Sequence, residues 1–215
     1  MKKAPKLCQD QSGIPRVILG SSSPRRRELL GHIIAHETHS PDVEEKPKSG
    51  EDPGSYTLRN AREKADATIK QVSGRADIQG QDAIVIACDT IVVLDGHILE
   101  KPIDAADAAR MLGMISGRTH TVISGLCVAH IQGAKTLRDK AFKVETRVTI
   151  KELSKEEIAT YVATGEPMDK AGSYAAQGIG AYMIERIDGS YSNVVGLPLT
   201  ELVQCLHDDF GVHLW

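Results

Sequence analysis

A cluster of serine and arginine residues follows the first apolar stretch of the chain. Residues 16–19 predict a buried strand that ends at Gly20, and the next seven residues are Ser-Ser-Ser-Pro-Arg-Arg-Arg. Ser23 followed by Pro24 is typical of a helix start, where unpaired N–H groups suit an anion. Serine hydroxyls and arginine guanidinium groups add donors for phosphate oxygens. A plain helix cap with a solvated basic face fits the same residues, so both interpretations stay open at this point.

Three carboxylates are candidates for metal or proton chemistry. Asp89 directly follows the apolar residues 83–88, and the end of a strand is where α/β folds place their ligands. Glu44 and Glu45 stand in a loop, residues 40–53, that is rich in lysine and proline. Mg²⁺ prefers a few carboxylates together with water and phosphate oxygens, and a carboxylate can also take a proton from water. A turn cap at Asp89 and a solvated charged loop at the glutamates explain the same pattern.

Two lysines and one glutamine complete the polar candidates. Lys64 falls at the edge of the apolar stripe of a helix, and Lys101 precedes Pro102, which fixes a rigid corner. Gln177 stands in a loop flanked by glycines, and its amide can both donate and accept hydrogen bonds, as base recognition requires. A snorkelling lysine, an exposed loop lysine and a structural turn are the alternatives. The eight histidines show no HxxxH or HExxH spacing, so none is assigned to a metal.

Helical periodicity and capping residues predict the helices that position these groups. A short helix at 24–32 is followed by an amphipathic helix at 58–72 and by one that Asp104 caps and that ends at Ile115. Ser154 and Glu157 form a capping box for a fourth helix, which Gly165 ends. Leucine and valine spacing over residues 199–206 predicts the last one.

Extended segments alternate with these helices. Residues 83–87 and 90–94 predict two strands, and Asp95-Gly96 predicts a hairpin turn into residues 97–99. Residues 118–129 and 140–150 predict a β-ribbon whose strands are joined by a polar loop at 130–139, and residues 182–187 predict a late strand. The fold class is therefore α/β, with a mixed twisted sheet and flanking helices. Residues 1–15 are expected to form a flexible tail and residues 16–215 a single domain.

Composition excludes several classes of protein. Hydrophobic residues make up 41% of the 215-residue chain, aromatic residues 4%, and the formal net charge is −3, which argues against a general nucleic-acid binder. Four widely spaced cysteines form neither a CxxC pair nor a disulfide framework, and the start of the chain lacks the apolar run of a signal peptide. We therefore expect a cytoplasmic protein with no membrane or nucleic-acid partner.

The motifs together resemble the Maf-like nucleotide pyrophosphatases, a family once named for septum formation. The first block is Val-Ile-Leu-Gly-Ser-Ser-Ser-Pro-Arg-Arg-Arg-Glu-Leu-Leu at residues 17–30. Further blocks follow in order: Ala-Arg-Glu-Lys-Ala at 61–65, Ala-Cys-Asp-Thr-Ile-Val-Val-Leu-Asp-Gly at 87–96, Glu-Lys-Pro at 100–102, Ser-Gly-Arg-Thr-His-Thr-Val at 116–122, and two late blocks at 164–178 and 189–199. They extend over nearly the whole chain from residue 16 to the last helix, and the chain departs from the pattern only in surface segments.

The resemblance implies a fold like that of the inosine triphosphate pyrophosphatases, with two lobes around a cleft. It also implies hydrolysis of a nucleoside triphosphate to the monophosphate and pyrophosphate, a divalent cation such as Mg²⁺ or Mn²⁺, and often a homodimer. By position it assigns the triphosphate to Ser21, Ser23, Arg25 and Arg26. Asp89 becomes the general base or water-orienting residue and a metal ligand, Glu45 joins the metal with Glu44 as fallback, and Lys64 and Lys101 become phosphate partners. Gln177 is assigned to the base, with Glu166, Asp169 and Lys170 nearby.

Two further functions compete with this one. A non-catalytic nucleotide sensor in cell division would need no base, so the set that includes Asp89 argues against it. A phosphate-loop nucleotidase would need GxxxxGK[ST], which the sequence lacks. Within the family, residues 166–172 with Gln177-Gly178 resemble the branch that acts on dTTP and UTP. The branch specific for 7-methyl-GTP carries a different sequence at Asp169-Lys170, and it remains the alternative.

Overall fold

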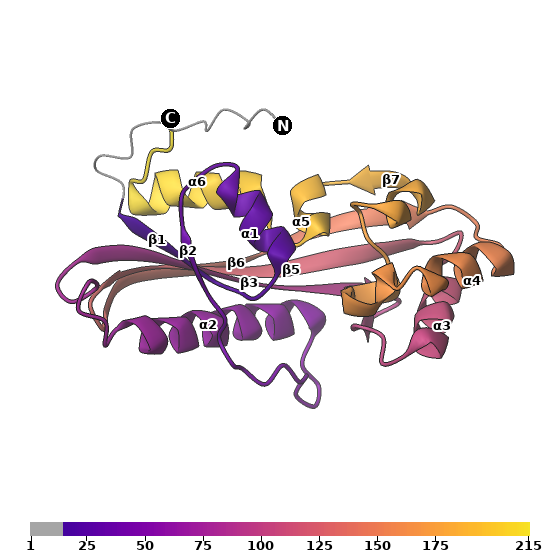
Figure 1. Cartoon of the computed structure of the whole chain (residues 1–215), viewed down its shortest axis with the longest axis horizontal. Coiled ribbons are helices and arrows are strands. Elements are labelled where there is room, and N and C mark those ends of the chain that lie inside the picture. The colour runs from indigo at the N-terminus through magenta and orange to yellow at the C-terminus, as the bar shows by residue number, and fades with distance from the viewer. Residues whose placement is uncertain (1–14) are drawn as a thin grey trace.

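The fold is a seven-stranded mixed β-sheet with helices on both faces (Figure 1). The computed structural model describes residues 15–215, so nearly all of the expected N-terminal tail lies outside the described residues. The strand order is β2-β1-β3-β5-β6-β7, and the short strand β4 also pairs with β3. Strands β1 (Arg16–Gly20), β2 (Glu37–His39) and β3 (Asp82–Leu94) run parallel, and the remaining pairs are antiparallel. The prediction of a mixed α/β fold with flanking helices is confirmed.

Two helical layers cover one half of the sheet (Figure 1). Helices α1 (Pro24–Gly31) and α6 (Leu199–Phe210) pack on one face, where Leu30 and Leu206 are fully buried against Leu19 and Ile86. Helix α2 (Pro53–Val72) covers the opposite face through small residues such as Ala61. Small side chains let this helix lie close to the sheet. The backbone of α2 approaches Gly125 so closely that a Cβ there would lie 2.2 Å from the Thr57 carbonyl oxygen.

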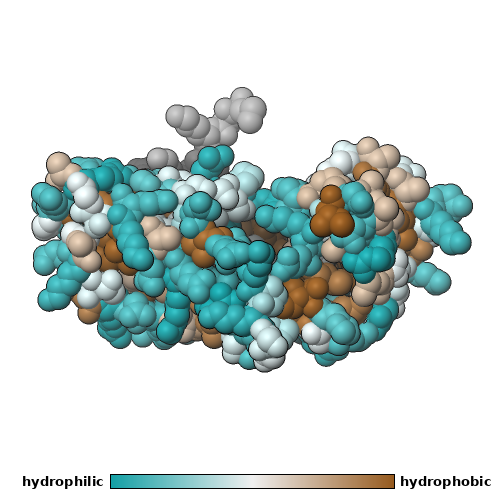
Figure 2. Space-filling model, turned by 90° about the horizontal axis from the view of Figure 1, so that it is seen from below, coloured by the Kyte–Doolittle hydropathy of each residue, from teal (hydrophilic) through white to brown (hydrophobic). Residues whose placement is uncertain are grey.

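The other half of the sheet carries a separate group of short elements. These are α3 (Ala105–Ile115), α4 (Lys155–Ala163), the 3-10 turns η1 (Glu166–Asp169), η2 (Ala171–Ser173) and η3 (Ile179–Met183), β7 (Ile184–Asp188) and α5 (Tyr191–Val195). Leu112, Ile115 and Tyr161 lie at the centre of the apolar cluster in this half. Figure 2 shows, from below, more brown surface on this half than over α2, where the surface is mainly hydrophilic. The helices therefore form two groups on one continuous sheet.

Three long strands connect the two halves, and here two predictions were wrong. Residues 83–87 and 90–94 are not separate strands, because β3 runs unbroken from Asp82 to Leu94. The loop predicted at 130–139 is mostly strand. Strands β5 (Thr119–Gln132) and β6 (Lys135–Ile150) continue through it, and only a tight turn containing Gly133 joins them. The side chains of residues 135–139 are exposed and mostly polar. The segment therefore lacks the alternation of apolar and polar residues from which a strand is predicted.

The helix starts agree with their capping residues in most cases. Ser23, Asp104 and Ser154 cap α1, α3 and α4, and the capping box between Ser154 and Glu157 is present. The start of α2 was predicted too late. The helix begins at Pro53 rather than near residue 58, because Asp52 caps it by accepting a hydrogen bond from Ser55 N.

A gap along one edge of β3 determines where the site lies. Strand β1 ends opposite Ala87, and β4 (His97–Leu99) begins to pair opposite Val92, so residues 88–91 have no neighbour on that edge. The turn after β1 opens beside this gap. Gly20 allows it, because a Cβ at this position would lie 2.3 Å from Thr68 Oγ1 of α2. Within residues 15–215, no helix is both long and apolar enough to cross a bilayer.

Candidate active site

A pocket of about 310 Å³ opens at this gap, where the two helical groups meet. Its walls come from the turn after β1, from the middle of β3, from α2 and from the segment around the 3-10 turns. The nine residues to which the sequence analysis gave a role at the site all line it: Ser21, Ser23, Arg25, Arg26, Glu45, Lys64, Asp89, Lys101 and Gln177. The structure thus brings together groups that lie up to 156 positions apart in the chain, between residues 21 and 177.

The start of α1 forms one end of the pocket. The Ser23 side chain caps the helix by accepting from Arg26 N, and Ser21 Oγ accepts from Ser23 N at 3.2 Å. Both serines therefore hold the turn in shape as well as facing the pocket. Pro24 stands at the first helical position and donates no N–H, as expected for a helix start. The helix dipole and the polar turn make this end suited to an anion.

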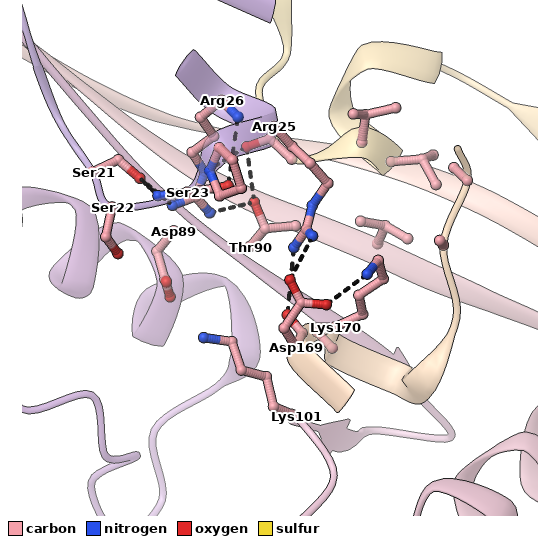
Figure 3. A pocket seen from close by; sticks show the side chains of 18 of the residues that line it. Ser21, Ser22, Ser23, Arg25, Arg26, Asp89, Thr90, Lys101, Asp169 and Lys170 are labelled. Atoms are coloured by element: carbon pink, nitrogen blue, oxygen red, sulfur yellow. Dashed lines mark hydrogen bonds and ion pairs between the residues drawn. The ribbon is translucent and has the colours of Figure 1, made fainter. Parts of the chain in front are cut away.

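Three hydrogen bonds hold the Arg26 guanidinium group at this end of the pocket (Figure 3). Its Nε donates to the Gly196 carbonyl at 2.7 Å, one terminal nitrogen donates to Thr90 Oγ1 at 3.1 Å, and the other donates to Ser21 Oγ at 3.3 Å. These three contacts leave N–H groups of the guanidinium for a further acceptor, because it carries five in all. The geometry presents a fixed positive charge at the base of the pocket.

Arg25 reaches across the pocket instead (Figure 3). It donates to the Asp169 carboxylate at 2.9 Å, and Lys170 contacts the same carboxylate through its ammonium group. Burial raises the pKa of Asp169, but hydrogen bonds from Lys170 and Arg25 outweigh it and hold the pKa below its ordinary value. Asp169 thus remains ionised and links the start of α1 to the opposite wall.

Asp89 lies in the stretch of β3 that pairs with β5 on one edge and has no neighbour on the other, and its side chain is on the face that α2 covers. Its carboxylate accepts from Lys64 Nζ at 2.7 Å and from Asn60 Nδ2 at 3.0 Å, and it is only 4% exposed. Asn60 and Lys64 are four residues apart, which places both on one side of α2. A buried carboxylate is stable only when paired and hydrogen-bonded, and these two side chains supply that environment.

The environment of Asp89 favours its charged form. Burial raises its pKa, but the charges of Lys64 and Arg26 and the hydrogen bonds from Lys64 and Asn60 outweigh that effect, so the pKa is lowered. The carboxylate is therefore an acceptor throughout the neutral range. It can accept a hydrogen bond from water or help to hold a cation.

Glu45 and Asp89 approach one another around the same ammonium group. Lys64 Nζ lies 2.9 Å from Glu45 Oε2 and 2.7 Å from Asp89 Oδ1, so both carboxylates point at one place. Glu44 does not line the pocket and pairs with Lys46 on the surface, which leaves Glu45 as the glutamate that faces the site. Among residues 15–215, no group of three or more histidine, cysteine, aspartate or glutamate side chains forms a metal cluster. Two convergent carboxylates suit a cation that takes its other ligands from water and phosphate.

The far end of the pocket is more apolar. Its apolar lining includes Val92, Val122, Val194 and Ala175. Gln177 also lines the pocket, and Figure 3 shows Lys101 extending toward the side that holds Asp89. The pocket therefore joins a cationic, phosphate-sized end to an apolar end with an amide, which suits a ligand with a charged tail and a planar ring.

Two residues of the site were not predicted from the sequence. Asp169 and Lys170, expected near Gln177, line the pocket, whereas Glu166 lies behind the lining, where its carboxylate accepts from the backbone N–H groups of Ile179 and Gly180. Asn60 and Thr90 were not identified, although they bind Asp89 and Arg26 directly. Asn60 stands one helical turn before Lys64, and Thr90 directly follows Asp89, so proximity to chosen residues was the available signal.

The fold and the pocket define an α/β protein in which acidic and basic side chains line one pocket. A sequence profile described as Maf-like protein matches residues 16–209. A dTTP/UTP pyrophosphatase of Geobacter sulfurreducens is 49% identical over 192 residues, covering 89% of this chain and 95% of that relative. A dTTP/UTP pyrophosphatase of Shewanella oneidensis is 46% identical over 198 residues, covering 89% and 97%. The chain belongs to the Maf-like family.

A weaker likeness extends to solved structures outside that family. The Staphylococcus aureus Ham1 protein matches with a TM-score of 0.42 and 15% sequence identity, and the match covers 79% of each chain. The Mycobacterium abscessus dITP/XTP pyrophosphatase gives a TM-score of 0.39 and 14% identity over 91% of this chain and 95% of that one.

Proposed function

We propose that this protein hydrolyses pyrimidine nucleoside triphosphates, such as dTTP and UTP, to the monophosphate and pyrophosphate. The observation that carries the proposal is the buried Asp89 carboxylate, which Lys64 and Asn60 hold in the same pocket as Arg25 and Arg26. A pure binding site for an anion has no need of a carboxylate there, because it repels phosphate. Relatives with 44–49% identity over most of the chain are named dTTP/UTP pyrophosphatases, and this supports the proposed activity.

In the proposed reaction, the pocket residues divide into those that bind phosphate and those that act on water. Arg26, Arg25 and Lys101 offset the charge of the triphosphate, and the start of α1 contributes its N–H groups. Asp89 accepts a hydrogen bond from a water molecule and orients it toward the α-phosphorus. The water oxygen forms a bond to that phosphorus, the bond to the bridging oxygen of the β-phosphate breaks, and pyrophosphate leaves. Asp89 takes up the proton that the water loses.

A divalent cation, Mg²⁺ or Mn²⁺, is part of the proposal. Glu45 and Asp89 would hold it, since their shared ion pair with Lys64 brings the two carboxylates close together. When bound, the cation would neutralise the charge that develops on the phosphate oxygens. Lys64 keeps the two carboxylates together by pairing with both of them.

The apolar end of the pocket supports the choice of a pyrimidine. Valine and alanine side chains line this end, and Gln177 of the same pocket offers a donor and an acceptor to a base edge. A site that hydrogen-bonds one base rejects another when its own buried polar groups are left unpaired. A purine would also need more room than a pyrimidine.

A nucleotide panel tests the proposal. The purified chain is incubated with dTTP, UTP, 5-methyl-UTP, ATP, GTP and 7-methyl-GTP, with Mg²⁺, with Mn²⁺ or with a chelator, and the products are separated. We expect monophosphate and pyrophosphate, the highest kcat/KM for dTTP and UTP, and loss of turnover in the chelator. Diphosphate and orthophosphate as products would refute the chemistry. A preference for 7-methyl-GTP would refute the base assignment alone.

We further propose a homodimer in a reducing, cytoplasmic compartment. The support is the family resemblance for the dimer and, for the compartment, three buried free thiols, Cys88, Cys127 and Cys205. Light scattering coupled to gel filtration tests the first, because a mass near the 23.3 kDa of one chain would contradict it. Fractionation of cells that express the tagged protein tests the second.

A further inference from the structure

The segment that carries Gln177 is fixed by side chains on both sides of it. Before Gln177, the N–H of Ala175 donates to the Tyr161 hydroxyl at 3.2 Å. After it, the N–H groups of Ile179 and Gly180 donate to the two oxygens of Glu166, at 3.0 and 2.8 Å. Gln177 therefore stands two positions from an anchored residue in each direction. The anchors come from α4 and η1, outside the pocket lining.

The backbone next to the Glu166 carboxylate has a conformation that leaves room for it. Gly178 adopts a φ of +83°, which few other residues adopt, and a Cβ at this position would lie 2.3 Å from Glu166 Oε1. Glycine thus makes room for the carboxylate against the chain directly after Gln177. Burial raises the pKa of Glu166, but hydrogen bonds from Gly180, Tyr161 and Ile179 outweigh it and lower the pKa. The carboxylate stays charged, and charged acceptors form the stronger hydrogen bonds.

These contacts indicate a role for the Glu166 carboxylate, which takes no part in the proposed reaction. We propose that Glu166 is a positioning residue for base selection, which holds Gln177 in place through the N–H groups of Ile179 and Gly180. The proposal rests on the proposed function, since it deepens the role of the same pocket. An amide discriminates between bases only when its donor and acceptor are held in one orientation, and a loose segment would lose that preference first.

Glu166→Gln is the most direct variant. A glutamine keeps the size of the side chain but offers one acceptor and one donor, so one of the two N–H groups loses its partner. The measurement is the ratio of kcat/KM for dTTP to kcat/KM for 7-methyl-GTP and for ATP. We expect this ratio to fall about tenfold in Glu166→Gln, through a higher KM for dTTP, while kcat for dTTP changes little.

A double-mutant cycle with Gln177→Ala separates positioning from a general loss of structure. If Glu166 acts through Gln177, the double variant has the same selectivity ratio as Gln177→Ala alone, because the effects do not add. Additive losses would overturn the proposal. Glu157→Gln is the matched control, since this carboxylate also binds a backbone N–H, that of Ser154 at 2.8 Å, far from the pocket. Its ratio is expected to equal that of the wild type.

Amide hydrogen exchange at residues 179 and 180 supplies a readout that needs no turnover. Glu166→Gln is expected to speed exchange at these two amides. Faster exchange with an unchanged selectivity ratio would show a merely structural carboxylate and overturn the proposal. If Glu166→Gln does not fold, Gly178→Ala displaces the same carboxylate and takes its place in the cycle. If the wild type prefers a purine, the proposed pyrimidine function fails, while the coupling of Glu166 to Gln177 is still measured on that base.

Discussion

Asp89 owes its ionised state to side chains that come from a different element. Lys64 and Asn60 of α2 bind its two oxygens, and Arg26 adds a charge nearby. Direct hydrogen bonds from neighbouring side chains therefore determine the reactivity of this carboxylate. Replacement of one atom is enough to test it.

Asp89→Asn is expected to keep the fold and to lower kcat about 10²–10⁴-fold, the usual loss when a general base is removed. Asparagine has the same shape but cannot take a proton. Steady-state kinetics with dTTP measure the effect, and circular dichroism checks the fold. Asp66→Asn, on the exposed side of α2, is the control and should leave kcat unchanged. A variant at Asp89 that retains more than about a third of the wild-type kcat would remove this residue from the mechanism.

Arg25 and Arg26 should contribute to binding rather than to turnover. Arg25→Ala and Arg26→Ala are each expected to weaken binding of a non-hydrolysed triphosphate analogue more than binding of the monophosphate, because both face the phosphate end. Calorimetry measures the two affinities. Arg27→Ala is the matched control, since Arg27 follows on the same helix but is exposed outside the pocket. Equal losses for mono- and triphosphate would place the arginines elsewhere.

His120 gives the fold a pH dependence. The residue is 2% exposed, its Nε2 shares a hydrogen bond of 2.8 Å with the Tyr174 hydroxyl, and burial lowers its pKa from 6.5 to about 4. The unfolded chain therefore binds a proton as the pH falls below 6.5, while the folded chain stays neutral until about pH 4. The free energy of unfolding should fall by about 1.4 kcal/mol for each pH unit within this window.

His120→Gln removes this titration, so the difference in unfolding free energy between variant and wild type should change between pH 6.5 and 4 and stay constant above pH 6.5. Urea unfolding at a series of pH values measures it. A difference that is constant over the whole range would mean that His120 titrates alike in both states.

At the scale of the elements, caps and turns decided which predictions were correct. The helix starts at Ser23, Asp104 and Ser154 follow from local hydrogen bonds, and such signals are written in a few adjacent residues. The continuous course of β5 and β6 through residues 130–139 depends on each strand pairing with the other. That pairing is not a local property, so the polar composition of the segment was misleading.

The candidate site shows the same division between local and distant information. The serine–arginine turn at 21–27 carries its own chemical signature, whereas the convergence of Glu45 with Asp89 follows from the packing of α2 and the loop before it. The assignment of these residues came from the family resemblance. Asn60 was missed because an asparagine in a helix carries no signal of its own, and only the register of α2 on the sheet shows its role.

The cap of α2 offers a test at this scale, because α2 carries both partners of Asp89. Asp52→Ala removes the hydrogen bond from Ser55 N, which is 3.0 Å long, and is expected to lower the free energy of unfolding by about 1 kcal/mol. Urea unfolding measures the loss. Asp52→Asn keeps an acceptor and should restore most of the stability, and no loss in the alanine variant would mean that the helix start needs no cap.

At the scale of the whole molecule, β3, β5 and β6 belong to both groups of helices. With 13, 14 and 16 residues, these strands run through the apolar clusters on both sides of the pocket. If these strands came apart, the apolar clusters of both groups of helices would be exposed to water. We therefore expect one cooperative unfolding transition for residues 16–215, as for a single domain.

Denaturant-dependent hydrogen exchange checks this expectation. Amides in α2 and in α4 should exchange through opening reactions that converge on the same free energy at rising urea concentration. Two separate limiting values would show that the halves unfold independently. Gly211→Ala, at an exposed helix end with a φ of +63°, is a mild destabilising variant that should shift both helices by the same amount.

The parallel pairing of β1 with β3 sets the order in which the molecule assembles. Strands β5 and β6 are joined by a tight turn, and only β4 and α3 separate β3 from β5, so these antiparallel strands close shorter loops than the crossover through α2 and can pair early. Strand β1 can pair with β3, with Gly20 beside Ala87, only after the crossover through α2 has formed. Contacts between distant parts of a chain form late in folding. We therefore expect the serine–arginine turn to reach Asp89 only in the last stage, so that recovery of nucleotide binding during refolding lags behind recovery of β-sheet content.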